Sequence, residues 1–181
     1  MAEVQKNNIN KGKIALREIH TGDIDRAEEY MNFVSALVDE DAPIGLNEKI
    51  TLERERDFLR NFIARADSKD AIYLTAWDGE KLIGICGIER MEFLQRHMGQ
   101  MGVVIAKDYR NQGVGTEMIK EALRLVNNMV DLKIVEMIVL STNERAIKLY
   151  KKLGFKEVAK IPRGYEYRGE LVDCIVMQHD I

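Results

Sequence analysis

The segment 110–116, with the sequence Arg-Asn-Gln-Gly-Val-Gly-Thr, has the residue types and spacing to bind a phosphate group. It lies between an apolar run at 102–106 and a helical pattern that begins at Val114. Glycine lets the backbone approach a ligand closely, and the first turn of a helix presents N–H groups that have no partner within the helix. Because a helix N-terminus also carries partial positive charge, the segment predicts a diphosphate site.

The spacing of the glycines excludes two common nucleotide motifs. Gly113 and Gly115 are followed three residues later by Met118, so the Gly-x-Gly-x-x-Gly fingerprint of dinucleotide sites is absent. The Gly-x-x-x-x-Gly-Lys-[Ser/Thr] pattern of the P-loop is absent as well. What remains is Arg-x-x-Gly-x-Gly, which by itself is compatible with a tight turn as well as with phosphate binding.

Composition and charge restrict the class of protein. A chain of 181 residues that is 46% hydrophobic and 31% charged predicts one globular domain. Its net charge of −3 gives no electrostatic reason to expect nucleic acid as a partner. Residues 1–12 lack the apolar middle of a secretory signal, and no apolar run approaches the ~20 residues that span a bilayer. Cys86 and Cys174 lack metal-ligand spacing and predict buried free thiols, so we expect a cytoplasmic protein with no membrane association and no metal.

Hydrophobic periodicity predicts the elements that position the glycine segment. We expect residues 1–12 to be flexible and residues 13–181 to form one domain. Strands are predicted at 13–19, 71–77, 82–89, 100–106, 134–140, 155–161 and 171–179, with turns at 78–79, 162–164 and 168–169. Helices are predicted after a cap at Thr21 or Asp23, around 52–63, from Val114 through Met129, and at 143–153. This order describes a single α/β domain whose mixed sheet of about six to seven strands is flanked by about four helices.

Two motifs at a fixed separation make residues 71–179 resemble the GCN5-related N-acetyltransferase (GNAT) family, and residues 13–66 match it in element order. The first motif is Val103-Val-Ile105-x-x-x-Tyr109-Arg110-x-x-Gly113-x-Gly115. The second is Asn143-x-x-Ala146-x-x-x-Tyr150-x-x-x-Gly154-Phe155. The resemblance implies a GNAT-like fold, acetyl-coenzyme A as the acetyl donor and an amine as the acceptor.

The resemblance also implies roles for individual residues. The N–H groups from Gln112 to Thr116 would hold the diphosphate, with Arg110 shaping the loop. The exposed edge of the strand at 103–105 would pair with the amides of the pantetheine arm, which Asn143 would also contact. The residues implied in coenzyme binding are Val103, Val104, Ile105, Arg110, Asn111, Gln112, Gly113, Val114, Gly115, Thr116 and Asn143.

Acetyl transfer requires a neutral amine, a stabilised oxyanion and a proton for the leaving thiolate. Tyr150 is the residue that the resemblance places as general acid, and its alternative role is aromatic packing. Glu89, at the end of the strand before the glycine segment's strand, is a candidate base. Glu92, His97 and a chain of water molecules are the alternatives.

The acceptor is less defined than the donor. The resemblance places its cleft between the first two helices, their connection and the last hairpin. The connection carries Asp39-Glu40-Asp41, which would either attract a cationic amine or form an exposed acidic helix end. We expect the acceptor to be a primary amine of a small amine, polyamine or amino acid, with a protein N-terminus or lysine as the alternative. A sensor that binds acetyl-coenzyme A without efficient transfer is a different class, and a homodimer is a further expectation.

Overall fold

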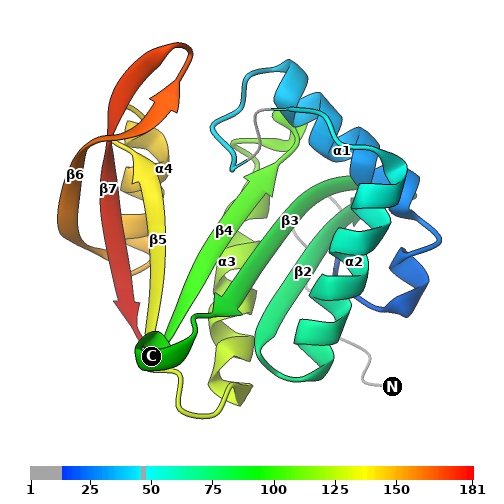
Figure 1. The fold of residues 1–181 in the computed structure, drawn as a ribbon, viewed down its shortest axis with the longest axis horizontal. Coiled ribbons are helices and arrows are strands. Elements are labelled where there is room, and N and C mark those ends of the chain that lie inside the picture. Colours follow the sequence, from blue (N-terminus) through cyan, green and yellow to red (C-terminus); the bar gives the residue numbers. More distant parts are fainter. Residues whose placement is uncertain (1–13, 46–47) are drawn as a thin grey trace.

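The computed structural model describes residues 14–45 and 48–181, so the segment 1–12 lies outside the described residues. Within these residues, seven strands form one mixed sheet in the order β1-β2-β3-β4-β5-β7-β6, with four α-helices on its faces (Figure 1). The strands are β1 (Ile14–Glu18), β2 (Ala71–Asp78), β3 (Lys81–Arg90), β4 (Met98–Ile105), β5 (Ile134–Leu140), β6 (Lys156–Tyr167) and β7 (Glu170–Asp180). The helices are α1 (Ala27–Asp39), α2 (Leu52–Asp67), α3 (Val114–Leu125) and α4 (Glu144–Lys152). The predicted α/β fold is confirmed.

The helices form two layers because each buries one apolar stripe. α1 and α2 pack on one face of the sheet around Tyr30, Leu59 and Trp77. α3 and α4 cover the other face, where Met118 and Tyr150 join the larger core cluster. Burial of apolar side chains at spacings of three and four residues stabilises this arrangement and fixes which side of each helix faces the strands.

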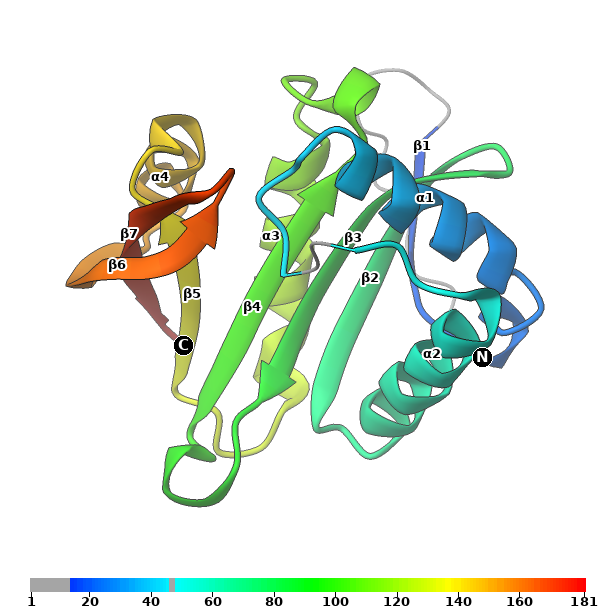
Figure 2. The same cartoon turned by 45° about the horizontal axis from the view of Figure 1, so that its top comes forward.

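The parallel pairing of β4 with β5 is short. Only three pairs form, Met98 with Ile134, Gly99 with Val135 and Gln100 with Glu136. β3 pairs with β4 along the whole stretch from Gly99 to Ile105, so the second half of β4 has a strand partner on one side only. Figure 2 shows β5 diverging from β4 beyond the paired end.

The start of α1 differs from the prediction. Thr21 and Asp23 lie in a short 3₁₀ turn, and α1 begins only at Ala27. Asp23 is fully buried and its carboxylate binds the guanidinium of Arg17 at 2.5 and 2.7 Å. The cap predicted at Thr21 or Asp23 is therefore wrong, because the carboxylate pairs with β1 instead of capping α1.

The end of the chain forms a longer hairpin than predicted. β6 continues through 162–164, where the register with β7 shifts between Ile161 and Tyr165, so this stretch is an irregularity of the strand rather than a turn. Pro162 is tolerated because β6 is the edge strand of the sheet. The predicted turn at 168–169 is confirmed, and its two residues have φ angles of +55° and +76°.

Candidate active site

A cavity of about 1050 Å³ lies where β4 and β5 separate. Its lining comes from the second half of both strands, the start of α3, one side of α4, the connection between α1 and α2, and the end of β6. The short β4–β5 ladder therefore creates a space that segments from both halves of the chain surround.

The free edge of β4 presents peptide groups to this cavity. The N–H of Ala106 donates to the carbonyl of Ile83 on β3 at 2.8 Å. Peptide groups of successive residues point to opposite sides of a strand, so those of Val103 and Ile105 point away from β3, toward the cavity. In agreement, the carbonyl of Ile105 accepts a hydrogen bond from Arg110 Nε at 2.9 Å. Val104 lines the cavity as well, but its peptide group faces β3.

The start of α3 is open to an anion. Gly113 precedes the helix with a φ of +86°, a conformation that glycine adopts without strain, and no side chain caps the helix. The N–H groups of its first turn, from Val114 to Thr116, therefore keep their hydrogen-bonding capacity. A side chain built on Gly113 would meet nothing within 4 Å, so there is room for a ligand beside the helix start. The segment fits a diphosphate.

The side chains of the loop before α3 bind the protein itself. Arg110 pairs with Glu40 from the end of α1 in addition to its bond to Ile105. Gln112 donates to the carbonyl of Asp108 and does not line the cavity, whereas Asn111 does. Arg110 thus ties the loop to β4 and α1, and the backbone N–H groups of the helix start are left without a partner from this loop.

The second motif places Asn143 and Tyr150 on the opposite wall of the cavity. Asn143 caps α4 by accepting a hydrogen bond from the N–H of Ala146 at 3.1 Å, and its amide NH₂ is left for other partners. Tyr150 lines the cavity with 8% of its surface exposed. Burial, with a smaller effect of the neighbouring Cys86 thiol, raises the pKa of the Tyr150 hydroxyl to about 12.

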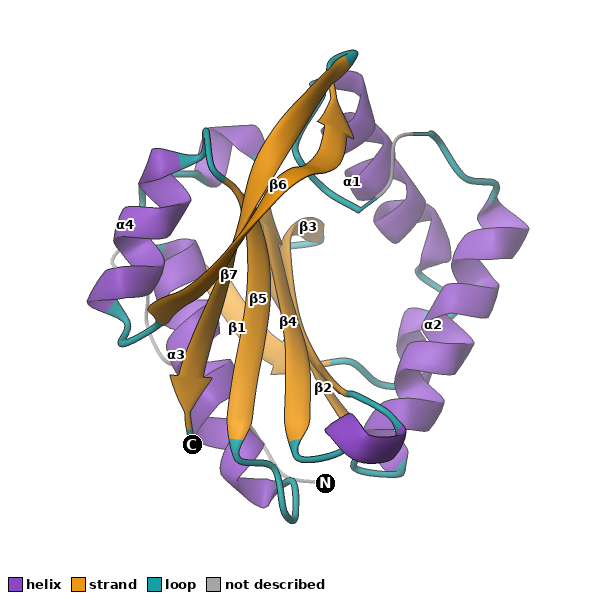
Figure 3. Cartoon of the chain, turned by 60° about the vertical axis from the view of Figure 1, so that its left-hand side comes forward, coloured by secondary structure: helices purple, strands orange, loops and turns teal. Residues whose placement is uncertain are grey.

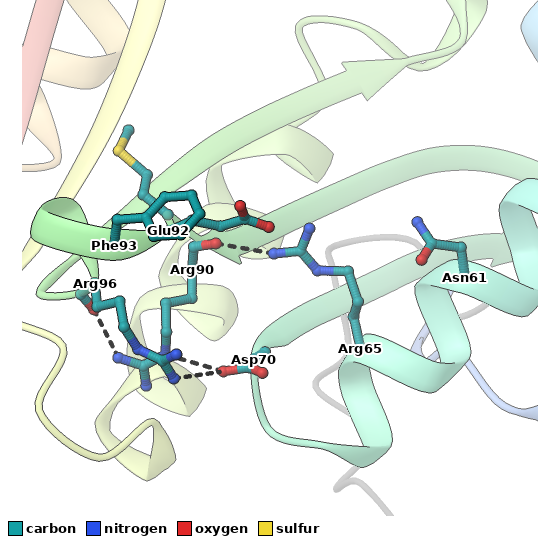
Figure 4. Close-up of a pocket in the computed structure, with 8 residues that line it drawn as sticks. Asn61, Arg65, Asp70, Arg90, Glu92, Phe93 and Arg96 are labelled. Carbon is teal, nitrogen blue, oxygen red and sulfur yellow. Dashed lines mark hydrogen bonds and ion pairs between the residues drawn. The ribbon is translucent and has the colours of Figure 1, made fainter.

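The structure does not bring the three candidate bases to the cavity. The Glu89 carboxylate forms an ion pair with Arg65 of α2 at 3.0 Å, and Glu89 lies opposite Gln100, where β4 is still paired with β5. Glu92 lines a separate pocket of about 480 Å³ beside Arg65 (Figure 4). His97 is exposed in the loop before β4 and lines neither space.

Two hydrogen bonds bridge segments that border the cavity. The hydroxyl of Tyr167 donates to the carbonyl of Asp41 at 2.7 Å, and Arg168 Nε donates to the Asp41 carboxylate at 3.1 Å. They join the β6–β7 hairpin to the α1–α2 connection, and Figure 3 shows the hairpin reaching toward the end of α1. The other two acids of the 39–41 cluster are also paired, Asp39 with Lys49 at 2.7 Å and Glu40 with Arg110.

Comparison with known proteins agrees with this geometry. The model of the acetyltransferase (GNAT) family matches residues 24–155, which include the glycine segment, both diverging strands and Tyr150. The chain belongs to the GNAT family. The resemblance inferred from the two motifs is thereby confirmed.

Curated relatives of this GNAT chain carry different acceptor names. An N-alpha-acetyltransferase of Sulfurisphaera tokodaii is 31% identical over 87 residues, which cover 48% of this chain and 52% of that protein. The L-amino acid N-acetyltransferase AaaT of Escherichia coli K12 is 32% identical over 82 residues, covering 45% and 50%. The chain thus spans about half the length of these relatives.

Solved structures match over nearly the whole GNAT chain. A GNAT-family acetyltransferase from Streptococcus pneumoniae has a TM-score of 0.82 and 28% identity, covering 93% of this chain and all of that one. The spermidine N-acetyltransferase of Vibrio cholerae, in complex with CoA and spermine, has a TM-score of 0.70 and 18% identity, covering 94% and 96%. The second likeness shows the fold alone.

Among the residues that line the cavity of this GNAT chain, the carboxylate-bearing Glu166 on β6 was not singled out by sequence reasoning. It has no ion-pair partner among residues 14–45 and 48–181. The signal was obscured because β6 was predicted to end at 161, which left Glu166 between two expected turns.

Two further observations concern the described residues as a whole. None of their helices combines the length and the apolar character that a bilayer-spanning helix requires. They also contain no cluster of three or more His, Cys, Asp or Glu side chains that would hold a metal ion. Cys86 and Cys174 are buried free thiols, as predicted.

Proposed function

We propose that this chain is an acetyl-coenzyme A-dependent N-acetyltransferase and that its acceptor is a small primary amine, such as a polyamine or an amino acid. The observation that carries the proposal is the cavity between the diverging ends of β4 and β5. It joins an anion-binding helix start to the hydroxyl of Tyr150. Family membership supports acetyl-coenzyme A as the donor.

The donor would lie along the free edge of β4. Its diphosphate would accept hydrogen bonds from the first turn of α3, where the helix dipole favours negative charge. Its pantetheine amides would pair with the cavity-facing peptide groups of Val103 and Ile105, as an added strand does. The amide of Asn143 would approach the same arm from α4. This arrangement directs the thioester toward Tyr150.

The transfer step would exchange one bond for another. The amine nitrogen attacks the acetyl carbonyl carbon, a C–N bond forms, and the C–S bond to coenzyme A breaks. N–H groups on the β4 edge would stabilise the charge on the carbonyl oxygen. Tyr150 would donate a proton to the leaving thiolate, and it would regain a proton from the one that the nitrogen releases after the attack. With a pKa of about 12, the hydroxyl is protonated throughout the neutral range.

The amine must reach the site in its neutral form. For a lysine-like amine with a pKa of about 10.4, deprotonation at neutral pH costs about 4–5 kcal/mol. Because Glu89, Glu92 and His97 do not line the cavity, we assign the removal of this proton to water molecules that lead to solvent.

The wall on the hairpin side supports a small cationic acceptor. Glu166 is a cavity-lining carboxylate, while Asp41 is held by Arg168. Tyr165 and Tyr167 from β6 and Leu37 from α1 also line the cavity and supply apolar surface to its wall. A cavity lined by both a carboxylate and apolar groups suits an alkyl ammonium ion, and the bridge between the hairpin and the α1–α2 connection would limit the room for a large acceptor.

The test is thiol release from acetyl-coenzyme A with a panel of polyamines, amino acids, simple amines and N-terminal peptides. We expect a small amine to give the highest kcat/KM. Preference for peptides would instead favour a protein N-terminus, in line with the several relatives that carry the name N-alpha-acetyltransferase. Tight coenzyme binding without stimulation by any amine would overturn transfer and indicate a sensor.

A further inference from the structure

Helix α4 carries three basic residues along the border of the cavity. Arg145, Lys148 and Lys152 all line it, whereas Lys151 of the same helix does not. Residues three, four and seven positions apart lie on one face of a helix, so the three side chains form one row. We call Arg145, Lys148 and Lys152 the α4 basic row.

The charge of the α4 basic row is only partly balanced. Among the described residues, Arg145 and Lys152 have no ion-pair partner. Lys148 contacts Glu144 at 3.4 Å, but both side chains are about three-quarters exposed, at 74% and 78%. An exposed pair of this kind contributes little to holding the lysine in place. The row therefore concentrates positive charge beside the cavity of a chain whose net charge is −3.

This charge is separate from the anion site at the start of α3. That site offers backbone N–H groups, and the one arginine beside it, Arg110, is already paired with Glu40. A ligand that engaged both the helix start and the α4 basic row would carry two anionic groups. Coenzyme A has two such groups, a diphosphate and a phosphomonoester on the 3′ oxygen of its ribose.

We propose that the α4 basic row binds the 3′-phosphate of coenzyme A and makes the chain discriminate against the dephosphorylated coenzyme. The inference rests on the function proposed above. A phosphomonoester carries about −1.5 to −2 charges at neutral pH, more than each phosphate of the diphosphate, and therefore gains most from the cationic row. The guanidinium of Arg145 can bind two phosphate oxygens at once, and the lysines add mobile point charges.

The test compares the binding of coenzyme A and 3′-dephospho-coenzyme A by calorimetry, which does not depend on catalysis. The wild-type chain is expected to bind coenzyme A about tenfold more tightly, the effect of about one charge-assisted hydrogen bond. In the double variant Arg145→Gln/Lys148→Gln, this preference should fall to about twofold or less, with the affinity for the dephosphorylated form nearly unchanged.

Lys151→Gln is the matched control, because Lys151 lies on the same helix, contacts Glu157 at 3.4 Å and does not line the cavity. It should keep the wild-type preference. An equal loss of affinity for both ligands in the double variant would place the row at the diphosphate and overturn the proposal. An unchanged preference would overturn it too. Equal binding of both ligands by the wild type refutes this inference alone, whereas binding of neither refutes the proposed function with it.

Discussion

Glu55, in the first turn of α2, predicts an unusual pH dependence of stability. The residue is 3% exposed, and its Oε2 atom has no hydrogen-bond partner among the described residues. Burial raises the pKa of this carboxyl from 4.5 to about 7, because the charged form loses its solvating water. The group is therefore protonated in the folded protein at a pH where the unfolded chain has already released the proton.

The size of the effect follows from the two pKa values. Between 4.5 and about 7 the folded state holds more protons than the unfolded state, so the free energy of unfolding falls as the pH rises. Above the folded-state pKa the whole penalty is present, and it amounts to about 3 kcal/mol. Glu55→Gln removes the charge. The stability of this variant relative to wild type should therefore be greater by about 2–3 kcal/mol at about pH 8 than at low pH. At about pH 5 this gain should be less than about 1 kcal/mol.

Urea unfolding of both proteins at the two pH values measures this difference. Glu53→Gln is the control, because Glu53 lies in the same turn but is exposed, and exposed substitutions usually change the free energy of unfolding by no more than about 0.5 kcal/mol. A stability difference between Glu55→Gln and wild type that is the same at both pH values would refute the buried-carboxyl reasoning.

Three further predictions concern the cavity. Gly113→Asp places a negative charge at the start of α3 and should weaken coenzyme A binding at least about tenfold by calorimetry; normal binding would mean that the diphosphate lies elsewhere. Glu166→Gln should raise KM for a cationic amine severalfold with kcat nearly unchanged, whereas Glu170→Gln, outside the cavity lining, should not, and an equal effect of both would remove Glu166 from the acceptor site. Arg168→Gln breaks the bond to Asp41 and should let larger amines react faster relative to small ones, so an unchanged ratio of kcat/KM values would contradict the role of the bridge.

The donor side of the site could be predicted because its signals are local. Adjacent residues in the sequence are enough to recognise each of them: a glycine before a helix, an apolar strand ahead of that glycine, and an asparagine at the start of the next helix. The structure has Gly113 in the left-handed region and Asn143 as the cap of α4. The extent of the β4–β5 ladder had no such signal, because it depends on segments far apart in the chain.

The acceptor side depends on tertiary pairing that single residues do not reveal. Glu89 was a reasonable base from its place on β3, but α2 brings Arg65 to its carboxylate. Asp41 was expected to be either an acceptor contact or an exposed acid; it is exposed, and it also holds the β6–β7 hairpin through Arg168. Glu166 was missed because a proline and a glycine within an edge strand have the composition of a turn.

The most direct test of the central claim, that the cavity between β4 and β5 is an acetyl-transfer site with Tyr150 as its acid, is the turnover of Tyr150→Phe. With the best amine of the panel, we expect kcat to fall about 10²- to 10⁴-fold while the Kd for coenzyme A stays within about threefold of wild type. Tyr165→Phe, which removes a hydroxyl from the exposed rim of the same cavity, should keep its activity. Wild-type turnover by Tyr150→Phe would contradict the account.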